Sequence, residues 1–61
     1  DFYKAVDSYK IACKTQLMEG CFALGLMYEN GHGVLKSPEA AQNLYKIACA
    51  GGYLKSCLSV K

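Results

Sequence analysis

The four cysteines carry the most chemistry in this 61-residue chain, because a thiol can form a disulfide or bind a metal ion. They fall into two equally spaced pairs, Cys13 with Cys21 and Cys49 with Cys57, and seven residues separate the partners of each pair. Zinc-binding pairs usually have only about two to four residues between them, so this spacing argues against a metal site. Dense cysteine in so short a chain favours a disulfide framework in an oxidising compartment. We therefore expect no metal ion and no cofactor.

The other residues that could do chemistry form no catalytic pattern. A serine β-lactamase needs a lysine three residues after its nucleophilic serine, and no serine here has lysine at that distance. The five carboxylates show no patterned pairing for acid–base catalysis. The single histidine, His32, lies between two glycines with no neighbouring nucleophile, and we expect it to face solvent. The residues themselves therefore predict no enzymatic activity.

Seven residues of the chain recur after a shift of 36 positions. Ala5 returns as Ala41, the Tyr-Lys-Ile-Ala-Cys run at 9–13 returns unchanged at 45–49, and all four cysteines keep this period. Self-similarity at a period of about 20 to 50 residues is typical of repeat proteins, in which each repeat is one supersecondary unit that stacks on the next.

The apolar residues recur at intervals of three and four, which is the period of one face of an α-helix. This pattern predicts helices over about 2–14, 18–29, 38–49 and 53–60. Asp1 and Ser37 have the residue types of N-caps, and Pro38 suits the first helical position. The run at 30–33 and the glycines at 51–52 are suited to ending a helix. No stretch alternates like a β-strand for more than a few residues, so we expect an all-α fold.

The cysteine spacing also bears on the turns. Residues eight apart on one helix are separated by about 12 Å of rise, whereas the Cα atoms of a disulfide lie within about 7 Å. A bond between Cys13 and Cys21 would therefore require the chain to reverse between them, and the same holds for Cys49 and Cys57. Each such bond would hold an αα-hairpin near its turn.

Small and aromatic residues recur with a characteristic spacing at Leu24, Gly25, Tyr28, Gly31, His32, Gly33, Val34, Ser37, Ala40, Ala41, Tyr45, Lys46 and Ala48. This spacing resembles the Sel1-like repeat, a relative of the tetratricopeptide repeat. The cysteines replace small residues of the usual repeat, as in the cysteine-rich branch typified by the Helicobacter cysteine-rich proteins. The resemblance covers the chain as one module, with a first repeat at about 1–36 and a partial second repeat at about 37–61.

The resemblance implies an αα-hairpin solenoid with one disulfide per repeat. Four cysteines allow three pairings, and the 36-residue register favours Cys13 with Cys21 and Cys49 with Cys57. The resemblance also implies a bacterial protein exported to the periplasm or beyond, acting as a scaffold for protein complexes. It leaves two alternatives: penicillin binding with weak β-lactamase activity, and an assembly factor of the mitochondrial intermembrane space.

A stripe of polar and aromatic residues runs along the first helix of each repeat, away from the apolar face. We take it as the candidate partner-binding surface: Tyr3, Asp7, Lys10, Lys14, Asn43 and Lys46. Solenoids use their stacked first helices as a concave binding face, so the expected partner is a protein or an adjacent repeat. A net charge of only +2 without any arginine argues against nucleic acid. No apolar stretch approaches the ~18 residues of a membrane span, so we expect no membrane insertion.

Two features of the expected core have predicted roles. Gly25 lies inside a helix, where glycine costs about 1 kcal/mol relative to alanine. We expect it to permit close approach of the facing helix near Tyr9. Tyr9 and Tyr45 should be core aromatics whose hydroxyls reach water.

Both ends of the chain lack the charged face of a solenoid cap. The family pattern would continue with Leu-Gly near positions 60 and 61, where this chain has Val60 and Lys61. Apolar side chains remain at both ends: Phe2, Tyr3, Val6, Tyr53, Leu54, Leu58 and Val60. Repeat arrays normally need about three or more units, so we expect this chain to belong to a longer solenoid or a larger complex.

Overall fold

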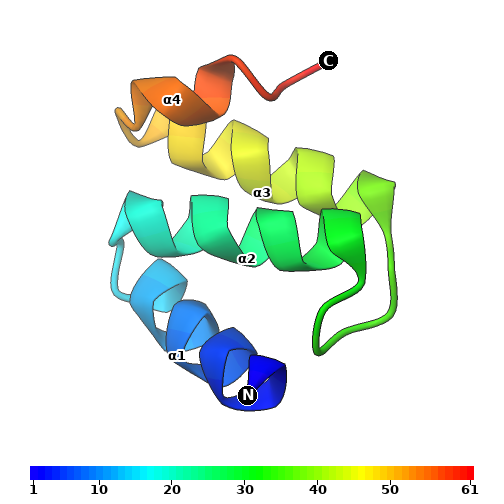
Figure 1. Cartoon of the computed structure of the whole chain (residues 1–61). Coiled ribbons are helices and arrows are strands. Elements are labelled where there is room, and N and C mark those ends of the chain that lie inside the picture. The colour runs from blue at the N-terminus through cyan, green and yellow to red at the C-terminus, as the bar shows by residue number, and fades with distance from the viewer.

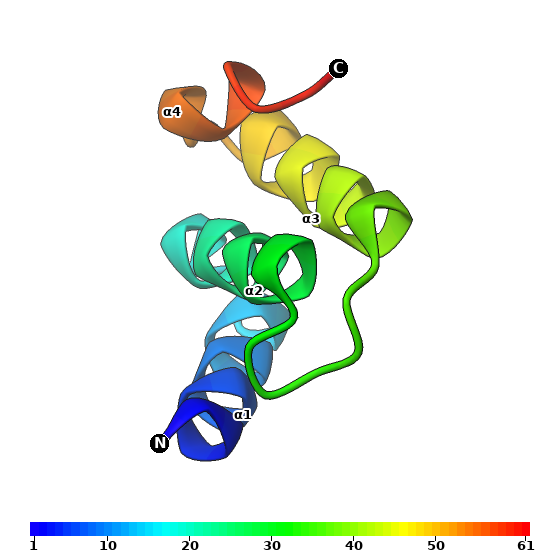
Figure 2. The same ribbon diagram turned by 45° about the vertical axis from the view of Figure 1, so that its right-hand side comes forward.

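Four α-helices make up the computed structural model, which describes all 61 residues (Figure 1). They are α1 (Phe2–Lys14), α2 (Met18–Asn30), α3 (Pro38–Ala50) and α4 (Leu54–Cys57). Each helix packs on the next one in the chain, so that α2 lies between α1 and α3 (Figure 2). The molecule measures 27 × 24 × 13 Å, as expected for a single layer of helices. The all-α helical-hairpin repeat predicted from the sequence is confirmed.

The predicted caps begin two of the long helices. The side chain of Asp1 accepts a hydrogen bond from the backbone N–H of Tyr3 at 2.8 Å, and that of Ser37 accepts from the N–H of Ala40 at 3.2 Å. Pro38 stands at the start of α3, where its missing N–H costs no helical hydrogen bond. Side chains thus satisfy amide groups that the helix itself leaves unpaired.

The loop between α2 and α3 returns over the start of α1. It begins at Gly31, whose φ of 70° is the left-handed conformation that glycine adopts without strain. The ring of His32 then stacks on the ring of Phe2, with centroids 4.3 Å apart and planes 16° from parallel. His32 remains exposed, in agreement with its expected place at the surface.

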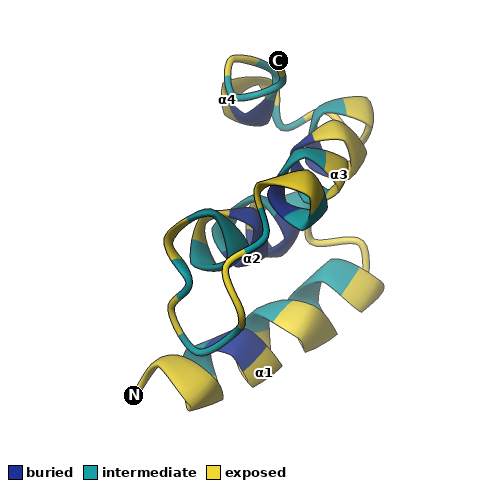
Figure 3. Cartoon of the chain, turned by 90° about the vertical axis from the view of Figure 1, so that its right-hand side faces the viewer, coloured by how far each residue is buried: buried dark blue, intermediate teal, exposed yellow.

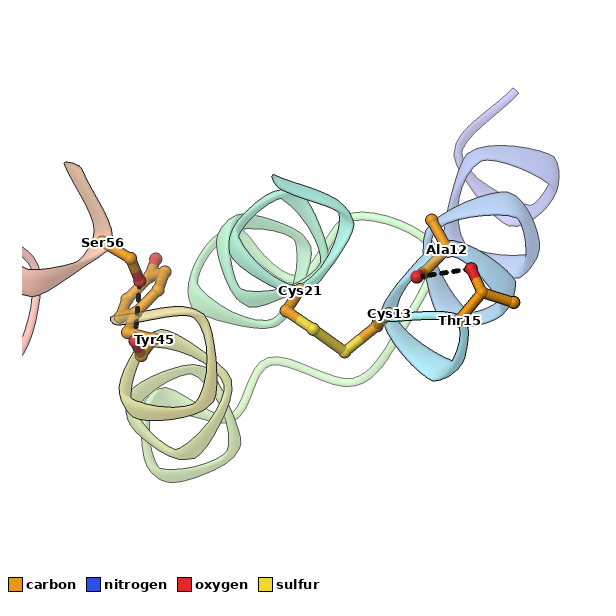
Figure 4. Close-up of a disulfide and its surroundings, with 6 residues drawn as sticks. All are labelled: Ala12, Cys13, Thr15, Cys21, Tyr45 and Ser56. Carbon is orange, nitrogen blue, oxygen red and sulfur yellow. Dashed lines mark hydrogen bonds between the residues drawn. A yellow bond between two sulfur atoms is a disulfide. The ribbon is translucent and has the colours of Figure 1, made fainter. Parts of the chain in front are cut away.

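Each hairpin is cross-linked next to its turn. Cys13 bonds Cys21 between α1 and α2 (Figure 4). Cys49 bonds Cys57 between α3 and α4. The Cα atoms of the two pairs are 4.6 and 4.8 Å apart, within the range for a disulfide. These are the pairs that the 36-residue register favours, and they leave no free thiol.

The fourth helix is shorter than the sequence predicts. The prediction over 53–60 is wrong in its length, since α4 covers only Leu54–Cys57. The next three amides bond carbonyls three residues back, as in a tighter turn. The side chain of Gln42 on α3 also holds this segment, donating to the carbonyl of Ser59 at 3.0 Å and accepting from the N–H of Lys61 at 2.8 Å. These contacts hold the segment after α4 against α3.

The core lies where α2 and α3 meet their neighbours, as the dark blue segments of Figure 3 show. Its buried members are Val6, Gly20, Cys21, Leu24, Gly25, Ala41, Tyr45, Ala48 and Ser56. Tyr45 is fully buried, whereas Tyr9, its counterpart one repeat earlier, is only half-buried. The difference arises because α3 packs on both α2 and α4, while α1 packs chiefly on α2.

Tyr45 corrects two expectations about the core. The close approach at Gly25 involves Tyr45 and not Tyr9, since a Cβ at Gly25 would lie 2.6 Å from Cε1 of the Tyr45 ring. The Tyr45 hydroxyl does not reach water either, because Tyr45 is fully buried, and the hydroxyl donates a hydrogen bond of 2.6 Å to Oε2 of Glu29. Burial, together with this bond and the negative charge of Glu29, raises the pKa of Tyr45 well above its usual value.

Candidate functional site

A groove of about 750 Å³ lies between α1 and α3, with α2 at its floor. We call it the α1–α3 groove, and its lining residues are Asp7, Lys10, Ile11, Cys13, Lys14, Leu24 and Ile47. Five of them come from α1, one from α2 and one from α3. First helices of successive repeats therefore form its two sides, as in the concave faces of solenoids.

Helical spacing explains the α1 side of the groove. Asp7, Lys10, Ile11 and Lys14 stand at positions i, i+3, i+4 and i+7, which lie on one face of a helix. Asp7 and Lys14 are therefore separated by about 10 Å along the helix axis. The charged side chains of this face are all exposed, so the groove has a polar rim on the α1 side.

An apolar strip crosses the groove from one repeat to the next. Ile11 is 64% exposed and Ile47 is 50% exposed, and the two occupy equivalent positions 36 residues apart. Leu24 lies between them at the floor, buried to 5% exposure. The fold leaves two large aliphatic side chains uncovered at the same point of each repeat, beside lysines. An apolar centre with a polar rim is the usual anatomy of a protein-binding surface.

The structure brings together three of the six residues proposed from the sequence as the partner surface. Asp7, Lys10 and Lys14 line the groove. Asn43 and Lys46 are exposed on α3 but do not line it, and Tyr3 lies at a separate small hollow beside the α2–α3 loop. The candidate surface is therefore centred on α1 and on the space between the repeats.

Sequence reasoning missed Ile11, Leu24 and Ile47. A signal for the two isoleucines was present, because Tyr-Lys-Ile-Ala-Cys recurs unchanged while its isoleucine falls off the apolar face. Tyrosine, alanine and cysteine of this run serve packing and the disulfide, which leaves lysine and isoleucine as a repeated surface pair. Leu24 lies on the apolar face and could not have been distinguished from an ordinary core residue.

A second hollow, of about 610 Å³, lies at the hairpin tips between the α1–α2 turn and the α3–α4 turn. Its lining residues are Tyr9, Ala12, Gln16, Leu17, Met18, Glu19, Gly20, Ala23, Gly51, Gly52 and Tyr53. Glu19 is the one charged side chain among them. The hollow therefore offers fewer charged side chains to a partner than the α1–α3 groove, which has three.

The hydroxyl groups of two serines serve the fold. Ser56 is buried and donates to the Tyr45 carbonyl at 2.7 Å, which ties α4 to α3 (Figure 4). Ser37 caps α3. No group of three or more His, Cys, Asp or Glu side chains gathers where it could hold a metal ion. None of the four helices has the length and apolar character needed to cross a membrane.

Comparison with known proteins adds independent information. The family profile described as Sel1 repeat matches residues 19–53, which cover most of α2 and the whole of α3. A Helicobacter pylori protein with the printed name "Putative beta-lactamase HcpD" is 50% identical over 34 residues. That segment is 56% of this chain but only 11% of the relative, so the match spans a small part of the longer protein. A search of solved structures gave no match.

Proposed function

Because the chain belongs to the Sel1 repeat family, we propose that it binds a segment of another protein in the α1–α3 groove and serves as a scaffold module. Sel1 repeats commonly mediate protein–protein interactions. The observation that carries the proposal is the pair Ile11 and Ile47, which are exposed at equivalent positions on either side of the groove.

The architecture around this pair supports a protein segment as the ligand. The groove is bordered by one helix on each side, which suits an extended or helical stretch of chain. The disulfide from Cys13 to Cys21 fixes α1 against α2 at the groove, so little conformational entropy would be lost on binding.

An exported location is part of the proposal. Disulfides persist in oxidising compartments, and both cysteine pairs of this chain are bonded. The bacterial relative supports the periplasm or the cell exterior over the mitochondrial intermembrane space. Fractionation of the source organism, followed by alkylation of free thiols, tests this placement. Chain recovered from the cytoplasm with four alkylated cysteines would contradict it.

Selection from a random peptide library tests the binding function. The oxidised chain should enrich peptides that shift the NMR signals of Ile11 and Ile47. Replacing Ile47 with serine should weaken the binding of these peptides. Replacing Leu35, which is 90% exposed and outside the groove, should leave their binding unchanged. Selected peptides that shift only signals elsewhere would show that the groove is not the binding site.

The printed name of the relative favours a second candidate, binding or hydrolysis of β-lactams. The chain contains no serine with a lysine three residues later, so the usual nucleophile and lysine pairing is absent. Hydrolysis of a chromogenic β-lactam by the purified chain, lost on replacement of a single residue, would support this candidate. If the absorbance of the β-lactam does not change at protein concentrations typical of an enzyme assay, this second candidate is excluded.

A further inference from the structure

We propose that the segment bound by the α1–α3 groove is acidic and amphipathic, with an apolar side chain flanked on one side by carboxylates. This inference rests on the proposed function and specifies its partner. It follows from three features of the groove: the position of its lysines, the position of its single acid, and the apolar strip between the repeats.

Both lysines of the groove belong to α1, with Lys14 toward the α1–α2 turn and Lys10 midway between Lys14 and Asp7. Lys10 and Lys14 are both exposed and lie one helical turn apart on the same face of α1. Each ammonium group at the end of its flexible stem can reach a carboxylate of a bound segment while the stem covers apolar surface. Two carboxylates spaced by about one turn of a helix, or by two residues of an extended strand, would match them.

The single acid stands at the other end. Asp7 is one turn before Lys10 and about 10 Å from Lys14 along α1. A carboxylate of the partner would be repelled at Asp7 and attracted at Lys14, so this polarity orients the segment. Its acidic part should lie toward the α1–α2 turn, next to the disulfide of Cys13.

The second repeat keeps one of the two lysines, since Lys46 matches Lys10 and Ala50 stands in place of Lys14, and it carries an exposed acid, Glu39, where the first repeat has Tyr3. Lys46 precedes Ile47 as Lys10 precedes Ile11, whereas Asn43 stands where the first repeat has Asp7. All three residues of the second repeat are exposed on α3. The excess positive charge of the groove therefore comes from Lys10 and Lys14 on α1, and it favours an anionic partner over a cationic one.

The apolar strip supplies the anchor. Ile11 and Ile47 stand on the two sides, and Leu24 closes the floor beneath them. A leucine or phenylalanine of the partner that entered this space would cover both exposed isoleucines, and such central apolar contacts dominate binding energy. Lysines at the rim would then set specificity and the rate of association.

Short fluorescent peptides test the inference with the oxidised 61-residue chain. The probe has one leucine followed by two glutamates placed two residues apart. Its matched variants carry glutamines or lysines in place of the glutamates, or serine in place of the leucine. The glutamine peptide should bind roughly 2- to 30-fold more weakly than the glutamate peptide, as expected for two exposed ion pairs. The difference should shrink at high salt.

Charge reversal in the protein provides the matched test. The double substitution Lys10→Glu with Lys14→Glu should shift preference to the lysine peptide, while Lys55→Glu, exposed on α4 outside the groove, should leave the order of affinities unchanged. Circular dichroism checks that both variants keep their helices. The salt dependence of peptide binding by the unsubstituted chain provides a test that needs no variant of the protein.

The outcomes separate the two levels of the proposal. If all charge variants of the peptide bind with equal affinity and Ile47→Ser still weakens the binding of each, the inference of an acidic partner is overturned. The proposal that the groove binds a protein segment then stands. If no peptide shifts the signals of Ile11 and Ile47, the groove itself is not a binding site. Self-association abolished by the Lys10 and Lys14 reversals would identify a second copy as the occupant and overturn the inference.

Discussion

Replacing Gly25 with alanine should destabilise the chain, although alanine is the better helix former. Gly25 is buried in the middle of α2, facing the ring of Tyr45. A methyl group there would lie 2.6 Å from Cε1 and 2.9 Å from Cδ1 of that ring. The tyrosine cannot withdraw easily, because its hydroxyl donates to Glu29 at 2.6 Å and its carbonyl accepts from Ser56 at 2.7 Å.

Two opposing effects determine how much Gly25→Ala changes the free energy of unfolding. Alanine gains about 1 kcal/mol of helix propensity over glycine. Overpacking of a tight core costs about 1–3 kcal/mol, and the upper part of this range applies because Tyr45 is fully buried and bonded at both ends. The free energy of unfolding should therefore fall by about 1–2 kcal/mol. For a domain of this size the melting temperature should fall by about 4–16 °C.

Thermal and urea unfolding of the oxidised chain, followed by circular dichroism, measure this loss. A double-mutant cycle isolates the contact. With Tyr45→Ala in the background the clash is gone, and Gly25→Ala should instead stabilise by up to about 1 kcal/mol. A variant Gly25→Ala that melts at or above the temperature of the original chain, or an effect unchanged by Tyr45→Ala, would refute the contact as the reason for glycine.

Three further predictions concern the disulfide, the buried tyrosine and the chain ends. Replacing Cys49 and Cys57 with serine should lower the free energy of unfolding by about 2.6 kcal/mol, the loop-entropy estimate for the nine residues that the bond encloses; urea unfolding unchanged by the substitution would contradict it. Because the fold raises the pKa of Tyr45 above its ordinary value near 10, this side chain's contribution is complete below about pH 10 and declines as the pH rises through the raised pKa. Stability should then fall more steeply in alkali than it does for Tyr45→Phe, and parallel pH profiles would count against this. Leu54 and Leu58 are 75% and 88% exposed, and we expect the isolated chain to associate with itself or adjacent repeats through them. Replacing both leucines with lysine should lower the sedimentation mass, and a folded monomer at high micromolar concentration without such affinity would show that the chain needs no neighbour.

The helices and hairpins were predictable from local features of the sequence. Helix period, cap residues such as Asp1 and Ser37, and glycines at the turns act over a few residues, so the three long helices agree with prediction to within one residue at each end. The repeat period added the long-range information, because equal spacing of the cysteines favoured one pairing of the three.

Burial and the extent of α4 depended on neighbours that the sequence does not specify locally. Tyr9 and Tyr45 lie in identical five-residue runs, yet only Tyr45 is enclosed, because α3 has a helix on each side. The contact of Gly25 with Tyr45 crosses from one repeat to the next for the same reason. The segment after α4 is held by the Gln42 side chain, 17 residues before its partner Ser59.

Half of the candidate surface followed from helical spacing on α1, and the other half did not. The stripe of Asp7, Lys10 and Lys14 could be placed on one helix face from the sequence. The apolar strip could not, because it requires knowing that Ile47 of α3 comes to lie opposite Ile11 across α2. A repeated, off-face isoleucine is a signal that can be sought in other repeat sequences.

The most direct test of the account is site-specific photo-crosslinking of the protein in its native cellular setting. A photoreactive residue at Ile47 should capture a protein segment, and the same residue at exposed Leu35 should not. Mass spectrometry of the crosslink should identify a stretch with an apolar residue beside carboxylates, attached at the α1–α3 groove. Capture at Leu35 but not at Ile47 would contradict the claim that the groove is where this chain binds its partner.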